Sequence, residues 1–147
     1  IERLSGSAVA TDRWDRLLSN GLRVWGFGHD DSHTAEDVGL SWVMVQGPDS
    51  DADSILSALR AGRFYSSTGV DITSIQLKEN RVAVYTSNAT RIRFITKWGV
   101  IQKSIESQAA DYILPDDPKQ ARALKYIRIE CYGVGCDVAW TQPIWIE

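Results

Sequence analysis

The stretch ITSIQLKENRVAVYTS, residues 72–87, decides the fold of the second half of the chain. Two runs rich in β-branched residues alternate in polarity, and Lys78, Glu79 and Asn80 lie between them. Alternation on both sides of a short polar segment is typical of two antiparallel strands joined as a β-hairpin. We therefore expect an antiparallel sheet to begin near residue 72.

The same pattern recurs toward the C-terminus. RIRFIT and VIQKSI (91–105) flank Lys97-Trp98-Gly99, and YIRIECY and DVAWTQPIWIE (126–147) flank a glycine-rich turn. The connector at 106–125 contains Pro115 and Pro118, so we expect no regular structure in its middle. Several short strands with few helices predict a small antiparallel β-sandwich over residues 71–147.

Working back toward the N-terminus, the pattern changes to alternating helices and strands. RWDRLLSNG (13–21) has helical spacing, with Thr11 or Asp12 as the expected N-cap and Gly21 at its end. Residues 22–27 and 39–47 are expected to be strands, the second covered on both faces because it is almost continuously apolar. Residues 50–62 are expected to form a second helix that ends at Gly62.

These patterns predict an α+β protein in two parts, 1–70 and 71–147. The chain has 147 residues, of which 44% are hydrophobic and 24% charged, and its formal net charge is −3. We see no basic cluster for a nucleic acid, no run near the roughly 20 apolar residues that span a membrane, and no signal peptide. We expect a soluble protein of unknown compartment. The first residue is Ile1, so we expect a processed chain or a piece of a longer one.

Two cysteines, Cys131 and Cys136, flank a glycine-rich turn. A disulfide across the hairpin and two half-buried thiols are both compatible with this spacing, and the thiols are the plainer interpretation.

The loop GFGHDDSHT, residues 26–34, contains both histidines of the chain. Asp31 and His33 are two positions apart, so at the end of a strand they would point to the same side and hold a metal between an oxygen and a nitrogen ligand. This pair suits Zn, Mn or Fe. The alternative is an exposed polar turn, because two ligands are too few for a catalytic zinc site.

Arg63 and Tyr65 follow the second helix and are candidate contacts for a phosphate or carboxylate. The alternative is that Arg63 is solvated while Tyr65 packs under the sheet.

The order WDRLLSNGLRVWGFGHDDSHT, GLSWVMVQ, SILSALRAGRFYSSTGV resembles the C-terminal end of the PHP family of metal-dependent phosphoesterases, in particular bacterial members with an accessory β-domain. The resemblance covers about residues 10–72, and the tail AWTQPIWIE is similar to that β-domain. It implies that residues 1–70 are the end of a distorted β/α barrel. It also implies that Asp31 and His33 are metal ligands, with His29, Arg63 and Tyr65 as candidate substrate contacts.

The resemblance implies hydrolysis of a small phosphorylated substrate at a multinuclear site of divalent ions. The His-x-His motif of the family is not in this sequence. We therefore expect the chain alone to be inactive, to bind metal weakly, and to associate with the missing N-terminal part of the barrel or with itself. The alternatives are a non-catalytic binding or interaction module and a purely structural domain.

Overall fold

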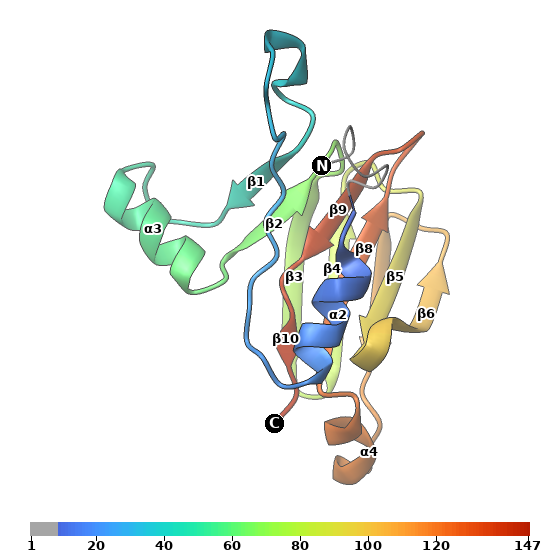
Figure 1. The fold of residues 1–147 in the computed structure, drawn as a ribbon. Coiled ribbons are helices and arrows are strands. Elements are labelled where there is room, and N and C mark those ends of the chain that lie inside the picture. Colours follow the sequence, from blue (N-terminus) through green and yellow to red (C-terminus); the bar gives the residue numbers. More distant parts are fainter. Residues whose placement is uncertain (1–8) are drawn as a thin grey trace.

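The protein combines short helices with two antiparallel sheets (Figure 1), so the predicted α+β class is confirmed. The computed structural model describes residues 9–147. Its α-helices are α2 (Thr11–Ser19), α3 (Ala52–Arg60) and α4 (Pro118–Ala123), and its 3₁₀ turns are η1 (Ala35–Asp37) and η2 (Lys97–Gly99).

The larger sheet has the strand order β1-β2-β9-β8-β5-β6, with β10 paired to β8, and the smaller sheet has the order β3-β4-β7. All pairs in both sheets are antiparallel. The strands are β1 (Trp42–Val45), β2 (Phe64–Ser67), β3 (Ile72–Lys78), β4 (Arg81–Thr86), β5 (Arg91–Thr96), β6 (Val100–Ile105), β7 (Ala109–Ile113), β8 (Tyr126–Tyr132), β9 (Val138–Thr141) and β10 (Ile144–Trp145).

The three predicted hairpins are confirmed as β3–β4, β5–β6 and β8–β9. Glu79 and Trp98 occupy their turns with positive φ values of 51° and 64°. Trp98 is exposed there, as expected of a turn residue. Alternate residues of β4, β5 and β8 face one shared apolar cluster, which lies between the two sheets. It comprises Val70, Val82, Val84, Ala89, Ile92, Phe94, Ile127, Ile129, Cys131 and Ala139.

The prediction of a strand at 22–27 is wrong, because the backbone of this segment does not pair with another strand. It is extended and is held by side chains instead. The strand expected at 39–47 shortens to β1, which lies at the edge of the sheet. Met44 is 41% exposed, so the prediction that both faces are covered is also wrong. An apolar run does not specify whether other parts of the protein will cover both faces of the strand.

Two predictions about local chemistry also need correction. The N-cap of α2 is Ala10 rather than Thr11 or Asp12, which lie inside the first turn. The connector at 106–125 has no regular structure at residues 114–117, as expected for its middle, but β7 and α4 flank this part. Pro118 opens α4 because proline lacks an N–H where a helix needs none, and the Asp117 carboxylate accepts from the Lys119 N–H at 2.9 Å.

The larger sheet contains strands from both sides of the predicted boundary at residue 70. Strand β2 lies before the boundary and pairs with β9, which lies after it. The division into two parts therefore stays a prediction. A β/α barrel is built from parallel strands, whereas the strand pairs of residues 9–147 are antiparallel and close no barrel. Figure 1 shows β1 and α3 extending away from the body of the two sheets.

The two cysteines are free thiols, so the disulfide left open by the sequence does not form. Cys131 is buried in the core and Cys136 is exposed at the hairpin. Burial raises the pKa of the Cys131 thiol to about 12. Within residues 9–147, the helices are too short or too polar to cross a membrane.

A buried ion network joins α2 to the outer face of β8. The Asp15 carboxylate accepts from Arg128 Nε and Nη2 at 2.7 and 2.6 Å and from the Tyr126 hydroxyl at 2.7 Å. Arg128 Nη1 donates to Glu130 Oε1 at 2.6 Å. Asp15, Arg128 and Glu130 are 4%, 2% and 6% exposed, so this network works without solvent screening.

We expect Asp15→Ala to lower the free energy of unfolding by about 3–5 kcal/mol. The Arg128 guanidinium would stay buried with Glu130 as its remaining negatively charged partner in this network. Urea unfolding measures this loss. The control is Asp12→Ala, an exposed acid on the same helix, which we expect to cost at most about 1 kcal/mol. Equal midpoints for the two variants would contradict a stabilising role for the network.

Candidate functional site

The candidate site is the loop formed by residues 29–41, which leaves the body of the protein between α2 and β1. Figure 1 shows it as the teal turn that projects beyond the ends of the sheets, with η1 at its tip. Asp31 and His33 are both exposed on it, as is His29. The predicted metal-binding pair therefore lies on one short turn that solvent can reach.

The base of the loop is held by Gln142, which lies just after β9. Its side-chain amide donates from Nε2 to the Gly26 carbonyl at 2.7 Å and accepts at Oε1 from the Gly26 N–H at 2.9 Å. The Ser66 hydroxyl donates to the same carbonyl at 3.2 Å. Both side chains are buried, so Gly26 is fixed against the sheet even though its segment is not a strand.

The two glycines before the loop allow close approach to this surface. A Cβ on Gly26 would come within 2.8 Å of the Trp14 ring, and one on Gly28 would come within 2.7 Å of the Ser41 hydroxyl. Between them, the Phe27 ring contacts the Phe64 ring with centroids 4.5 Å apart. The GFG sequence thus places the loop against β2.

Asp30 closes the loop onto the start of β1. Its carboxylate accepts from the Gly39 N–H at 2.8 Å and from the Ser41 N–H at 2.5 Å. These backbone hydrogen bonds, with the Gly39 bond the strongest effect, hold the pKa of Asp30 below its ordinary value of 3.8. Asp30 therefore has a structural role in the loop.

Asp37 shapes the tip of the loop. Its Oδ2 accepts from the N–H groups of His33 and Thr34 at 3.0 and 2.8 Å and from the Thr34 hydroxyl at 3.0 Å. Asp37 is 8% exposed. The sequence analysis missed this residue, although the spacing Thr34-x-x-Asp37 is that of a capping box at the start of η1.

The backbone of Asp31 contacts both histidine rings. The Asp31 N–H donates to His29 Nδ1 at 3.2 Å, and the Asp31 carbonyl oxygen lies 2.6 Å from His33 Nδ1. Asp31 has a positive φ of 53°, which lets its two peptide groups serve both rings. The turn thus fixes the orientation of both imidazoles.

The other two candidate residues lie on β2 and just before it. Arg63 is exposed, and its backbone joins α3 to the end of β1 by accepting from the Gln46 N–H and donating to the Ala58 carbonyl, both at 2.9 Å. Tyr65 packs against the apolar core, and its hydroxyl accepts from the Ile72 N–H at 3.1 Å. Tyr65 therefore packs against the sheet, which the sequence analysis gave as its alternative role. Substrate contact by either residue stays a prediction.

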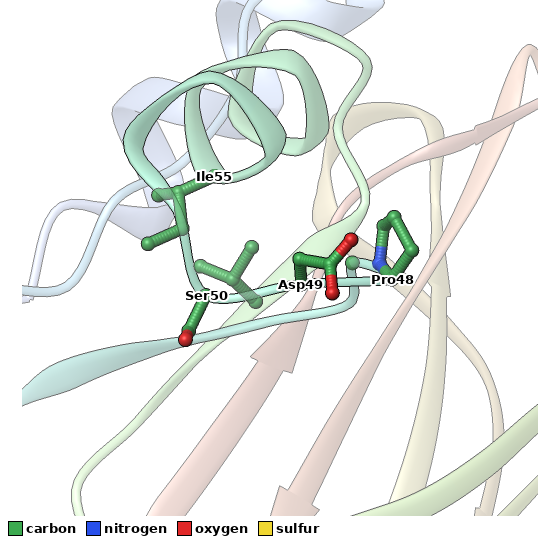
Figure 2. Close-up of a pocket in the computed structure, with 6 residues that line it drawn as sticks. Pro48, Asp49, Ser50 and Ile55 are labelled. Carbon is green, nitrogen blue, oxygen red and sulfur yellow. The ribbon is translucent and has the colours of Figure 1, made fainter.

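A shallow pocket of about 380 Å³ lies where β1 leads into α3. Figure 2 shows Pro48, Asp49 and Ser50 on the loop below Ile55 of α3. Val45 and Gly47 complete the lining. The pocket has one carboxylate and none of the predicted site residues, so its chemistry does not point to catalysis.

The donor set at the turn fits part of a metal site. Asp31 supplies a carboxylate and His33 an imidazole whose Nδ1 is held by a carbonyl, which is the usual arrangement of a metal-binding histidine. Across residues 9–147, however, no three His, Cys, Asp or Glu side chains gather where they could hold one ion. Metal binding by Asp31 and His33 stays a prediction.

We expect the amide signals of Gly39 and Ser41 to shift together as the pH falls through a midpoint below 3.8. The folded-state pKa of Asp30 is lowered, so its contribution to the loop is complete above 3.8 and is lost only as the pH falls through that lower value. Proton–nitrogen correlation spectra recorded against pH measure the midpoint.

The matched variant is Asp30→Asn, which removes the titrating group. Its single side-chain oxygen can take the place of only one of the two carboxylate oxygens that accept from the Gly39 and Ser41 N–H groups. We expect it to abolish the shared transition, whereas Asp49→Asn, the same change in a neighbouring loop, should leave it in place. A transition that persists in Asp30→Asn would contradict this origin.

Comparison with known proteins identifies the segment that contains this loop. Residues 24–64 match the family model PHP_C, described as PHP-associated. The match begins within the segment held by Gln142, spans Asp31 and His33, and ends at the first residue of β2. Comparison with curated proteins and with solved structures gave no significant match. Residues 24–64 are therefore similar to a PHP-associated region.

Proposed function

We propose that the chain is the C-terminal part of a metal-dependent phosphoesterase of the PHP family, in which Asp31 and His33 are two ligands of a divalent metal cluster. The observation that carries this proposal is that the PHP-associated match covers the turn on which these two side chains lie. The resemblance of residues 10–72 to the family supports the same reading.

The geometry of His33 supports its part in the proposal. Its Nδ1 donates to the Asp31 carbonyl, so the Nε2 lone pair points away from that contact. The ring is exposed, which leaves room for an ion and further ligands. Asp31 comes from the same turn and supplies the hard oxygen donor that Zn, Mn or Fe accepts beside an imidazole.

Divalent ions, when bound, would supply a water of lowered pKa and a positive charge for the phosphoryl oxygens. The contribution of this chain is to hold two ligands in fixed positions. Asp30, Asp37 and Gln142 perform that task, because they satisfy the backbone of the loop and tie its base to the sheet. In hydrolysis the water oxygen bonds to phosphorus, the ester P–O bond breaks, and the leaving alcohol takes up a proton.

We further propose that residues 1–70 are the end of the family's distorted β/α barrel, followed by an accessory β-sandwich. The remaining metal ligands would come from the N-terminal part of that barrel. Strand β1 supports this, because it is an apolar edge strand with a row of backbone groups that a neighbouring strand could pair with. Exposed apolar side chains nearby, including Phe27, Val38, Leu40 and Leu56, support the same partner. Alone, the chain would be inactive and would self-associate through this edge.

We expect the chain to bind Zn²⁺ or Mn²⁺ weakly, and Asp31→Asn or His33→Gln to lower the affinity by at least about tenfold, since each removes a direct ligand. Isothermal titration measures the affinity. Glu36→Gln removes the same charge from the same loop and should change it little. Equal affinity in all four proteins would rule out Asp31 and His33 as ligands.

We expect Met44→Lys to reduce self-association, because a lysine on an edge strand opposes pairing with a second strand. Sedimentation velocity over a range of protein concentrations measures the association. Gln76→Lys adds the same charge to an exposed strand position of the smaller sheet and should leave it unchanged. A parent chain that stays monomeric at every concentration would count against the proposed edge.

A further inference from the structure

Two arginines lie over one tyrosine ring on the outer face of the larger sheet, the face turned away from the apolar core. In the β5–β8 register Arg91 is opposite Tyr132 and Arg93 is opposite Glu130. The guanidinium carbons of Arg91 and Arg93 lie 4.6 and 4.9 Å from the centre of the Tyr132 ring. Arg93 Nη1 also donates to the Tyr132 hydroxyl at 3.2 Å. Residues two apart on a strand point to the same side, so one ring holds two positive charges close together.

Neither arginine has an acid of its own in the part of the chain that the structure describes, since none of the ion pairs of residues 9–147 includes Arg91 or Arg93. Glu130 lies opposite Arg93, but its Oε1 accepts from Arg128 Nη1 at 2.6 Å and its Oε2 accepts from the Tyr132 hydroxyl at 2.5 Å. Both arginines are half-buried, so water screens the repulsion between them only in part. A bound anion would reduce this repulsion.

The unfilled hydrogen-bonding positions of the two guanidiniums are on the same edge of each group. Arg91 Nε and Arg93 Nε are buried without a hydrogen-bond partner, although buried polar side-chain atoms are ordinarily paired. Arg128, on the same face of the sheet, shows what this edge can bind. Its Nε and Nη2 donate to the two oxygens of the Asp15 carboxylate at 2.7 and 2.6 Å. The corresponding edge of Arg91 and of Arg93 has no oxyanion.

We propose that Arg91 and Arg93 form a binding site for a small oxyanion that carries two negative charges. Each guanidinium would donate from its Nε edge to oxygen atoms of the ligand, as Arg128 does to Asp15. The Tyr132 ring is a positioning group, because it holds both planar cations at its surface and keeps Arg93 in place through its hydroxyl. The site lies on β5 and β8, so it requires neither a metal ion nor the loop 29–41.

Sulfate is the probe, because it carries two charges at neutral pH and is not a phosphate ester that a phosphoesterase could cleave. The full chain, labelled with ¹⁵N, is titrated with sodium sulfate while sodium chloride keeps the ionic strength constant. We expect the Nε–H signals of both arginines to shift together and to saturate with one dissociation constant. Arg91→Lys and Arg93→Lys assign these signals. Shifts that sodium chloride alone reproduces would overturn the proposal.

Malonate, a dicarboxylate with the same charge, is titrated in a second arm. Tighter binding of sulfate would identify a tetrahedral anion as the natural ligand, and tighter binding of malonate would identify a dicarboxylate. If neither anion moves the two Nε–H signals, the site does not exist. Asp31→Asn should leave the sulfate titration unchanged, so failure of the proposed metal site and failure of this site are distinguishable.

Substitutions of the arginines test their direct contact with the anion. We expect Arg91→Gln and Arg93→Gln each to weaken sulfate binding roughly tenfold, since each removes a pair of charge-assisted hydrogen bonds. Arg91→Lys keeps the charge but not the planar edge, and we expect an intermediate loss. Arg122→Gln removes the same charge from an exposed position on α4 and should change the affinity by less than about twofold. An equal loss in Arg122→Gln would show that sulfate responds to total charge and would overturn the proposal.

Discussion

The buried ion pair between Asp15 and Arg128 is the interaction on which the arrangement of the chain depends. Neither charge could remain out of water alone, because the cost of burying an isolated ion is several kcal/mol. The pair therefore fixes α2 on the outer face of β8, with the Trp14 ring against the Arg128 guanidinium at 5.5 Å. Trp14 in turn donates from its indole to the Val24 carbonyl at 3.1 Å. The segment that leads to the candidate site starts from this contact.

The aspartates of the candidate site divide into two kinds. The Asp30 and Asp37 carboxylates each accept from two backbone N–H groups of the loop, so they give the loop its shape. Asp31 is exposed, and its backbone contacts two imidazoles. The sequence HDDSH thus separates the residues that build the turn from those that could act on a ligand.

Patterns within a few residues predicted much of this fold. The hairpins and α3 were foreseen because alternation, turn residues and the glycine at position 62 are local signals. The irregular middle of the connector was foreseen, but α4 was missed because proline is compatible with the first turn of a helix as well as with an irregular segment. Segment 22–27 has the composition of a strand, yet no neighbouring backbone pairs with it. Composition alone does not supply a partner.

The contacts that could not be foreseen join residues far apart in the chain. Asp15 and Arg128 are 113 positions apart, and each has the appearance of a surface residue in its own segment. Tyr65 packs against the core and the adjacent Ser66 donates to the Gly26 carbonyl, and the sequence of β2 alone does not decide which of the two faces the core. The presence of Asp31 and His33 on one turn was visible in the sequence, whereas the contacts of both imidazoles with the Asp31 backbone required the geometry of the loop.

The Gln142 contact has a consequence for how the protein is made. Gln142 and Gly26 are 116 positions apart, and a chain emerges from the ribosome N-terminus first. The Gln142 contact therefore cannot form until residue 142 has been synthesised, whereas the Ser66 contact with the same carbonyl can form much earlier. Contacts of such long sequence separation also form slowly. During translation, the turn carrying Asp31 and His33 is therefore present in the growing chain long before Gln142 can support its base.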